Sequence, residues 1–398
     1  TREFVVVSNG NPDCAATIVD GNERVVRARL DDAKFFYEED LKVSLDEFAS
    51  RLDKVVFQEK LGTVLQKVER MEAISRSAAE LCGLSAEDAE KTVRAAHLAK
   101  ADLVSQAVVE FTSQQGVMGG YYAKAAGEPA EVCEAIAEHY RPRFAGDELP
   151  SGTVGKLVAL SDKLDTVCGI FAINEPPTGS SDPFAVRRSA IGVIALLRAL
   201  PRFALRDLIA CALDALAAQG VEFDAEKVAG DVATFFSGRL ASIARDEGVR
   251  PDTIEALASA DIIDPTEFLR RAHALEDARA DEPELFDDLA TAYARASHLG
   301  DAALGCDVDA DSLGGAESSL LAACDAGEAS VQAHLAAGDY EAALADLAGL
   351  REPIDTFFDE VLVMDEDEAV RNNRLRLLNR FARVFDGVAD IGALARKR

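Results

Sequence analysis

Two aspartates, Asp162 and Asp165, stand in a segment that is otherwise almost wholly apolar, from Leu157 to Asn174. The apolar residues of this segment follow the i, i+3, i+4, i+7 spacing of a helix face, and its other sides carry little charge. Residues three apart share a face of a helix, and carboxylates in an apolar setting must find a partner. A metal ion as the partner would allow hydrolytic chemistry. An arginine or a backbone group would make the pair structural.

Arginines gather in a second segment, PTGSSDPFAVRR (177–188), which follows this predicted helix. Asp182 is a suitable cap for a helix that starts at Pro183, because proline is favoured in the first turn. Arg187 and Arg188 then lie within two turns of the cap. They could bind RNA phosphates, which arginine does with two parallel hydrogen bonds.

The same arginines allow a structural interpretation. A buried carboxylate needs a cation, so one of them could neutralise Asp162 or Asp165 across a pair of helices. Arg141 and Arg143, in the segment RPRF (141–144), suit either role.

A third group of polar residues lies on the last predicted helix, in RNNRLRLLNRFARVF (371–385). Leucines and phenylalanines form its apolar stripe, and Arg376, Arg380 and Arg383 fall on the opposite side. A basic face in an acidic chain could bind RNA phosphates. It could equally be a solvated face with no ligand.

Other polar residues of this helix differ in position. Arg374 falls inside the apolar stripe, where the acidic run DEDE (365–368) offers ion-pair partners. It is also a candidate for tRNA binding, like the other arginines of this helix. Arg371, Asn372 and Asn373 lie near the start of the helix. Asparagine can hydrogen-bond to base edges, and arginine can bind phosphate or stack on splayed bases.

The elements that must position these residues are predicted to be helices. The chain has 398 residues, so two or three domains are expected. Hydrophobic residues make up 48% of the chain, and after the first thirty positions Ala, Leu, Glu and Asp prevail over alternating β-branched residues. The strand-like run EFVVVSNG near the start suggests that residues 1–29 are the remnant of a preceding domain.

Composition narrows the possible functions. A formal net charge of −29 argues against a general nucleic-acid binder, so any contact with RNA must come from local basic clusters. Seven cysteines without a CxxC pair, no signal peptide and no apolar run of membrane length indicate a cytoplasmic protein. The sequence has no Gly-rich phosphate loop, nucleophile elbow or Cys/His zinc spacing, so nothing in it indicates activation of an amino acid.

Several blocks together resemble the β subunit of the bacterial tetrameric glycyl-tRNA synthetase, in its C-terminal portion. They occur in the order of the family, and no single short motif carries the resemblance. The blocks are KVVFQEKLGT (54–63), KADL (100–103), QGVMGGYY (115–122), HYRPRFAGD (139–147), SDKLD (161–165), PTGSSDPFAVRR (177–188), LREPIDTFFDEVLVM (350–364) and RNNRLRLLNRF (371–381).

The resemblance implies a mainly α fold with a short β remnant at the N-terminus. An HD-like helical domain (30–210) would be followed by a helical connection (211–270) and a helical bundle of the DALR anticodon-binding type (271–398). The segment that contains RNNRLRLLNRF would help to shape the anticodon-binding surface.

The resemblance also implies a role in ligase chemistry, the ATP-dependent glycylation of tRNA. This chain would hold glycine tRNA, and the α subunit would hold glycine, ATP and Mg in an α2β2 heterotetramer. The chain itself is then expected to bind no cofactor and to be non-catalytic alone.

An HD-like domain raises the question of a metal site. A working site needs several His and Asp ligands, including an adjacent His-Asp pair. The position of that pair reads Ala101-Asp102, so one ligand is missing. We therefore expect a degenerate site whose aspartates are held by Lys100, Lys163 or Arg187, with the members His97, Asp102, His139, Asp162 and Asp165.

Two alternatives stay open at this point. The first is a metal-dependent phosphohydrolase of the HD type. The second is a purely structural module that only assembles the tetramer.

Overall fold

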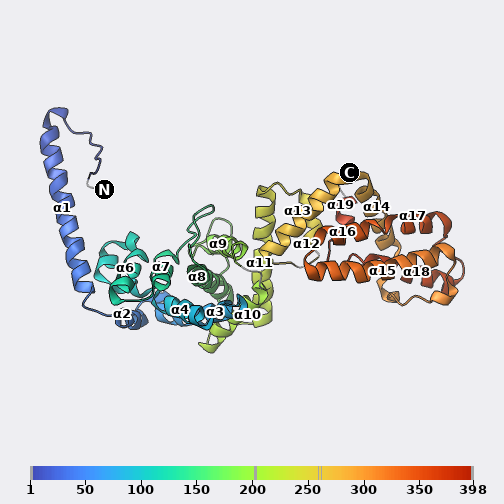
Figure 1. Ribbon diagram of the computed structural model, residues 1–398, viewed down its shortest axis with the longest axis horizontal. Helices are drawn as coiled ribbons and strands as arrows, with labels where there is room; N and C mark the ends of the chain where they lie inside the picture. Colours follow the sequence, from blue (N-terminus) through green and yellow to red (C-terminus); the bar gives the residue numbers. More distant parts are fainter. Residues whose placement is uncertain (1–2, 201–203, 259, 261, 396–398) are drawn as a thin grey trace. The chain divides into compact units, whose positions relative to one another are not determined.

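The computed structural model describes residues 3–200, 204–258, 260 and 262–395 (Figure 1). The chain divides into two compact units, Thr1–Val232 and Ala233–Arg398, and the division falls inside helix α11 (Ala225–Asp246). The predicted domain boundaries at 29/30 and 270/271 fall inside helices α1 and α13. The outermost positions of the predicted ranges 1–29 and 271–398 lie outside the described residues.

The described residues are 72% helical, which confirms the mainly α prediction. In the first unit the helices are α1 (Ala15–Asp40), α2 (Leu45–Arg51), α3 (Val64–Leu81), α4 (Ala86–Leu98), α5 (Gln106–Glu110), α6 (Val117–Ala126), α7 (Ala130–Glu138), α8 (Thr153–Ala172), α9 (Val186–Arg198) and α10 (Leu205–Ala218). In the second unit they are α12 (Pro251–Ala258), α13 (Pro265–Asp281), α14 (Pro283–Leu299), α15 (Gly315–Ala337), α16 (Tyr340–Ala348), α17 (Arg351–Glu360), α18 (Glu368–Arg383) and α19 (Gly392–Ala395). None of the described helices is long and apolar enough to cross a bilayer.

The β contribution is small and lies early in the chain. Strand β1 (Val56–Gln58) pairs antiparallel with β2 (Gly62–Thr63). The strand expected in EFVVVSNG is not formed, because a strand needs a hydrogen-bonded neighbour and no described segment pairs with residues 3–9. The helical pattern also starts earlier than expected, since α1 begins at Ala15 after a 3₁₀ turn capped by Asn11.

Helix α8 lies at the centre of the first unit, where it packs against α3, α4, α7, α9 and α10 (Figure 1). Most of its residues are buried, including Ser161, Asp162, Lys163 and Asp165. This confirms that little of the segment from Leu157 onward faces water. The helix therefore brings two carboxylates and an ammonium group into a low-dielectric core, where each must be paired.

Helix α18 has a comparable place in the second unit, where it packs against α14 and α15. Its apolar stripe is buried as the helical wheel predicts, with Leu377, Leu378 and Phe381 fully covered. Asp367 caps the helix by accepting the backbone N–H of Ala369 at 2.8 Å.

Candidate functional site

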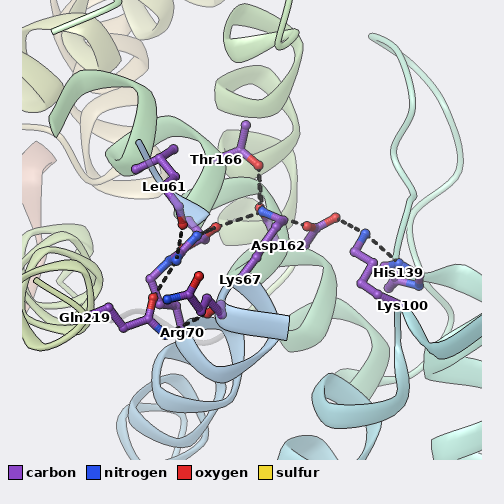
Figure 2. Close-up of polar contacts among 10 residues, drawn as sticks. Leu61, Lys67, Arg70, Lys100, His139, Asp162, Thr166 and Gln219 are labelled. Atoms are coloured by element: carbon purple, nitrogen blue, oxygen red, sulfur yellow. Dashed lines mark hydrogen bonds and ion pairs between the residues drawn. The ribbon is translucent and has the colours of Figure 1, made fainter. Parts of the chain in front are cut away.

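Two buried ammonium groups flank the aspartates of α8 (Figure 2). Nζ of Lys100 lies 2.8 Å from Oδ2 of Asp162, and Nζ of Lys67 lies 3.1 Å from Oδ1 of the same carboxylate. Burial alone would raise the pKa of Asp162, but the charges of Lys100 and Lys67 outweigh burial and hold this pKa well below its ordinary value. Asp162 is therefore an ionised carboxylate between two cations.

Asp165 has a second set of partners. Nζ of Lys67 lies 2.9 Å from its Oδ2, and Nε of Arg70 lies 2.5 Å from its Oδ1. Arg70 also donates from Nη1 to the backbone oxygen of Leu61 at 3.2 Å and to Oε1 of Gln219 at 2.6 Å. This network ties α3 to α8 and to the end of α10, and Figure 2 shows it running from Gln219 through Arg70 and Lys67 to Asp162.

His139 closes the network on the other side of Lys100. Its side chain is fully buried, with Nδ1 2.7 Å from the backbone oxygen of Ile136 and Nε2 2.9 Å from Nζ of Lys100. Burial and the neighbouring Lys100 charge lower the pKa of His139 well below its ordinary value. The imidazole is therefore neutral: Nδ1–H donates to Ile136 and Nε2 accepts from the Lys100 ammonium, which also lies 3.8 Å from the ring centroid of Tyr140.

Asp102 is also fully buried, on a short 3₁₀ helix (Ala101–Val104) after α4. Its Oδ2 accepts the backbone N–H groups of Gly116 and Gly119, at 2.6 and 2.8 Å, at the start of α6. Its Oδ1 has no hydrogen-bond partner among the described residues. Burial raises the pKa of Asp102 to about 6, although the two backbone hydrogen bonds oppose the rise. Asp102 thus serves as an internal cap of α6.

His97 lies apart from this group. Its Nδ1 is 2.8 Å from Oε1 of Glu72, and its Nε2 is 3.5 Å from Oδ1 of Asp46. The hydrogen bond to Glu72 raises the pKa of His97 despite partial burial. The side chain is therefore used in an ion-pair cluster between α2, α3 and α4.

The donor set does not fit a metal ion. Ala101 offers no ligand atom, and the Lys100 ammonium occupies the position between Nε2 of His139 and the carboxylate of Asp162. An ammonium group is a cation with three hydrogen-bond donors, so it can bind both acceptors and supply the positive charge that a metal would bring. Within residues 3–200, 204–258, 260 and 262–395, no three His, Cys, Asp or Glu side chains are grouped to hold an ion. A phosphohydrolase mechanism therefore has no support in these residues.

The expected partners of the aspartates are partly right. Lys100 does hold Asp162, whereas Lys163 donates instead to the backbone oxygen of Tyr140 at 3.1 Å. Burial lowers the pKa of Lys163 to about 8. Lys67 and Arg70 are absent from the sequence prediction, although a signal was present: both interrupt the buried stripe of α3.

In the segment 177–188, Asp182 caps the helix as predicted, but the helix starts three residues later than predicted. Asp182 accepts the backbone N–H groups of Val186 and Arg187, at 2.7 and 3.0 Å. Helix α9 starts at Val186 and not at Pro183, because Ala185 adopts a left-handed conformation that interrupts the turn. Arg187 is half-buried and Arg188 is exposed, and neither guanidinium is ion-paired with a residue that the structure describes. The predicted pairing of Arg187 or Arg188 with Asp162 or Asp165 is wrong, because Lys67, Arg70 and Lys100 take those carboxylates.

The segment RPRF lies between α7 and α8. Arg141 is paired with Glu138, with Nη1 3.0 Å from Oε1. Arg143 is exposed, and its backbone N–H donates to Oδ2 of Asp147 at 2.7 Å. Phe144 beside it is 62% exposed. An exposed ring is a surface on which an unpaired base could stack.

On α18, several predicted RNA contacts are occupied within the unit. Asn373 is buried and forms three hydrogen bonds: Oδ1 accepts the N–H of Asp309 at 2.8 Å, and Nδ2 donates to the backbone oxygen of Asp309 and to Oγ of Ser312. Nε of Arg376 donates to the backbone oxygen of Leu304 at 3.2 Å. These hydrogen bonds hold the loop between α14 and α15.

The other arginines of α18 face carboxylates. Arg374 pairs with Asp365 at 2.8 Å, as predicted for the DEDE run, and also with Glu317 on α15 at 2.5 Å. Arg380 binds Asp325 and Glu328, and Arg383 binds Glu328, all on α15. Arg371 donates to the backbone oxygen of Asp365, while Asn372 is half-exposed with no side-chain partner among the described residues.

The second unit gives the class of the protein. Its residues 289–391, which run from within α14 to beyond the end of α18, match the family model described as DALR anticodon binding domain.

The first part of the chain gives the family. Residues 1–259 match the family model described as glycyl-tRNA synthetase beta subunit. The glycine–tRNA ligase beta subunit of Geobacter metallireducens is 43% identical over 98% of this chain and 57% of its own length. The corresponding subunits of Haemophilus influenzae strain PittGG and Thiobacillus denitrificans are each 42% identical, over 98% and 99% of this chain and 56% of their own length. The chain belongs to the glycyl-tRNA synthetase beta subunit family, and it spans little more than half the length of these relatives.

Proposed function

We propose that this chain is the tRNA-binding portion of a glycine–tRNA ligase β subunit. It supports the ATP-dependent glycylation of tRNA together with an α subunit, which holds glycine, ATP and Mg. The observation that supports this most strongly is the succession of two family matches in one chain, the beta subunit model over 1–259 and the DALR domain over 289–391.

In this proposal the chain is not catalytic alone. The first unit is an HD-like domain in which lysines take the place of a metal, so it supports RNA binding and carries out no hydrolysis. The working enzyme is an α2β2 heterotetramer in the cytoplasm. The relatives are beta subunits by name, which implies an α partner for this chain as well.

The tRNA contacts of the first unit are assigned to Arg143, Arg187 and Arg188, with Arg141 beside them. Arg143 and Arg188 are exposed, and the guanidinium groups of Arg187 and Arg188 are free of ion pairs in the described part of the chain. In a chain of net charge −29, unneutralised arginines are the groups that can attract phosphates.

The contacts of the second unit are assigned to Arg371, Asn372, Arg376 and Arg383. Arg371 and Arg376 each donate to a backbone oxygen within the unit, through Nη1 and Nε respectively, and the proposal assigns the rest of each guanidinium to phosphate. The Arg383 side chain is 44% exposed, so its pair with Glu328 is weak and can be exchanged for a phosphate. Asn373, Arg374 and Arg380 shape this surface from inside, since they bind the α14–α15 loop and α15.

A salt-dependent filter-binding titration with glycine tRNA tests the proposal. The triple variant Arg143→Gln, Arg187→Gln, Arg188→Gln should bind more weakly, and the slope of log affinity against log salt should fall by about 0.7–0.9 for each phosphate that an arginine no longer neutralises. A matched control removes three exposed cations elsewhere, in Arg24→Gln, Lys34→Gln, Lys60→Gln. Wild-type binding no stronger than that of an unrelated acidic protein would refute the proposal, and equally weakened binding in both triples would refute the assignment of these arginines.

A further inference from the structure

The second unit contains a groove with an apolar floor and an acidic rim. It lies between α13, α14 and α16 and has a volume of about 550 Å³. Twelve residues line it, eight apolar and four acidic, and none of them is basic. The acidic residues are Asp277, Asp281, Glu282 and Glu341.

The groove is hollow because the facing helices present alanines. Ala274 and Ala278 are one turn apart on α13, and Ala345 and Ala348 are nearly one turn apart on α16. Larger side chains lie underneath, such as Phe286, which is 5% exposed. The floor is therefore apolar, shallow and lined by short side chains.

The rim is acidic and not neutralised. Asp277, Asp281, Glu282 and Glu341 are all exposed, and none has an ion-pair partner among the described residues. Arg279 on the same helix is paired elsewhere, with Asp252 at 2.8 Å. Carboxylates that share a rim repel one another, and a cation placed among them relieves that repulsion.

A second hollow of about 480 Å³ continues the groove and shares Ala274, Asp277 and Glu341 with it. Arg270 and His273 lie at its far end, where Arg270 donates to the backbone oxygen of Gly338 at 3.0 Å. From Ala274 to Asp281 the groove follows α13 for about 10 Å, or roughly two helical turns. That length matches roughly two turns of a helix lying along the groove.

We propose that this groove binds a cationic amphipathic helix of a partner protein. The apolar face of that helix covers the alanine floor, and its lysines or arginines reach the four rim carboxylates. RNA does not fit, because phosphates are repelled by the rim. A second copy of this chain is less suited to the groove, because two chains of net charge −29 repel each other. The groove is thus an interaction surface distinct from the tRNA contacts proposed above.

Fluorescence anisotropy on the whole chain tests the proposal, with a labelled synthetic Leu/Lys amphipathic helix as the probe. A scrambled peptide of the same composition measures binding by charge alone. The groove variant is Asp277→Asn, Asp281→Asn, Glu282→Gln, Glu341→Gln. The matched control changes four exposed acids elsewhere, in Asp31→Asn, Asp32→Asn, Glu90→Gln, Glu352→Gln. Circular dichroism establishes that each variant is folded.

The amphipathic probe should bind the wild-type chain more tightly than the scrambled peptide. The groove variant should bind the probe about ten-fold more weakly than the wild-type chain. The matched control variant should bind it less than about two-fold more weakly. Ala345→Gln, which fills the floor without changing the charge, should weaken it as well. Equal affinity for both peptides, or equally weakened binding in both quadruple variants, would overturn the proposal. So would a concentration-dependent dimer that disappears only in the groove variant, because the occupant would then be a second copy.

Discussion

The ammonium of Lys100 lies 2.8 Å from Oδ2 of Asp162, and both side chains are buried. The same ammonium contacts Nε2 of His139 at 2.9 Å. A fixed cation of the protein itself thus stands between an imidazole and a carboxylate, the two ligand types of a metal site. These contacts give the buried polar group of the first unit a structural role. Removing the Lys100 ammonium should therefore decrease the stability of the fold.

Replacing Lys100 by methionine should destabilise the first unit by about 3–5 kcal/mol. The change leaves the buried carboxylate of Asp162 with Lys67 as its remaining close cation, and breaking a buried pair costs far more than breaking an exposed one. Chemical denaturation followed by circular dichroism measures the decrease. Lys60→Met is the control: its pair with Glu175 is exposed, so less than about 1 kcal/mol is expected. Similar decreases in the two variants would contradict the structural role.

Asp102 should make stability depend on pH. Burial raises its pKa to about 6 in the folded chain, above its ordinary value of 3.8. The folded state therefore binds this proton more readily, so the contribution of Asp102 favours folding at low pH and is lost as the pH rises through about 6. Relative to Asp102→Asn, the wild-type chain should lose about 1 kcal/mol of stability between about pH 5 and pH 7.5.

Denaturation of both proteins across this range measures the difference, and the titrations of His139 and Asp162 are common to both. A stability difference that does not change with pH would show that Asp102 has an ordinary pKa.

Asn373 should act on the loop between α14 and α15 and not on RNA directly. Asn373→Ala removes three hydrogen bonds to Asp309 and Ser312, so amide exchange in residues 301–314 should rise, at a cost of about 1–3 kcal/mol. Asn372→Ala is the neighbouring control, because this side chain has no partner among the described residues. It should leave amide exchange unchanged and weaken tRNA binding. The reverse pattern would exchange the roles of the two asparagines.

The sequence predicts the helical class and the buried character of α8 well, because periodic apolar spacing reports directly on burial. It also predicts that Arg374 pairs with the DEDE run, since a charge inside an apolar stripe needs a nearby partner. Both inferences depend on residues that are close together in the chain.

Partners distant in the sequence could not be assigned in this way. Lys67 and Asp165 are 98 positions apart, and only the packing of α3 against α8 makes them a pair. The basic face of α18 looks free in the sequence for the same reason: Asp325 and Glu328 become its partners only when α15 packs alongside. The prediction of a strand in EFVVVSNG is wrong, because a segment with strand propensity still needs a neighbouring strand with which to pair.

Metal binding to the whole chain tests the central claim, that lysine ammonium groups replace a metal in the first unit. The chain and its Asp162→Asn variant would be dialysed against Mn²⁺, and their metal content measured by elemental analysis together with phosphodiester hydrolysis. We expect no stoichiometric metal in either protein and no hydrolysis above that of the buffer. One Mn²⁺ per chain that disappears in Asp162→Asn, together with hydrolysis that disappears with it, would contradict the account.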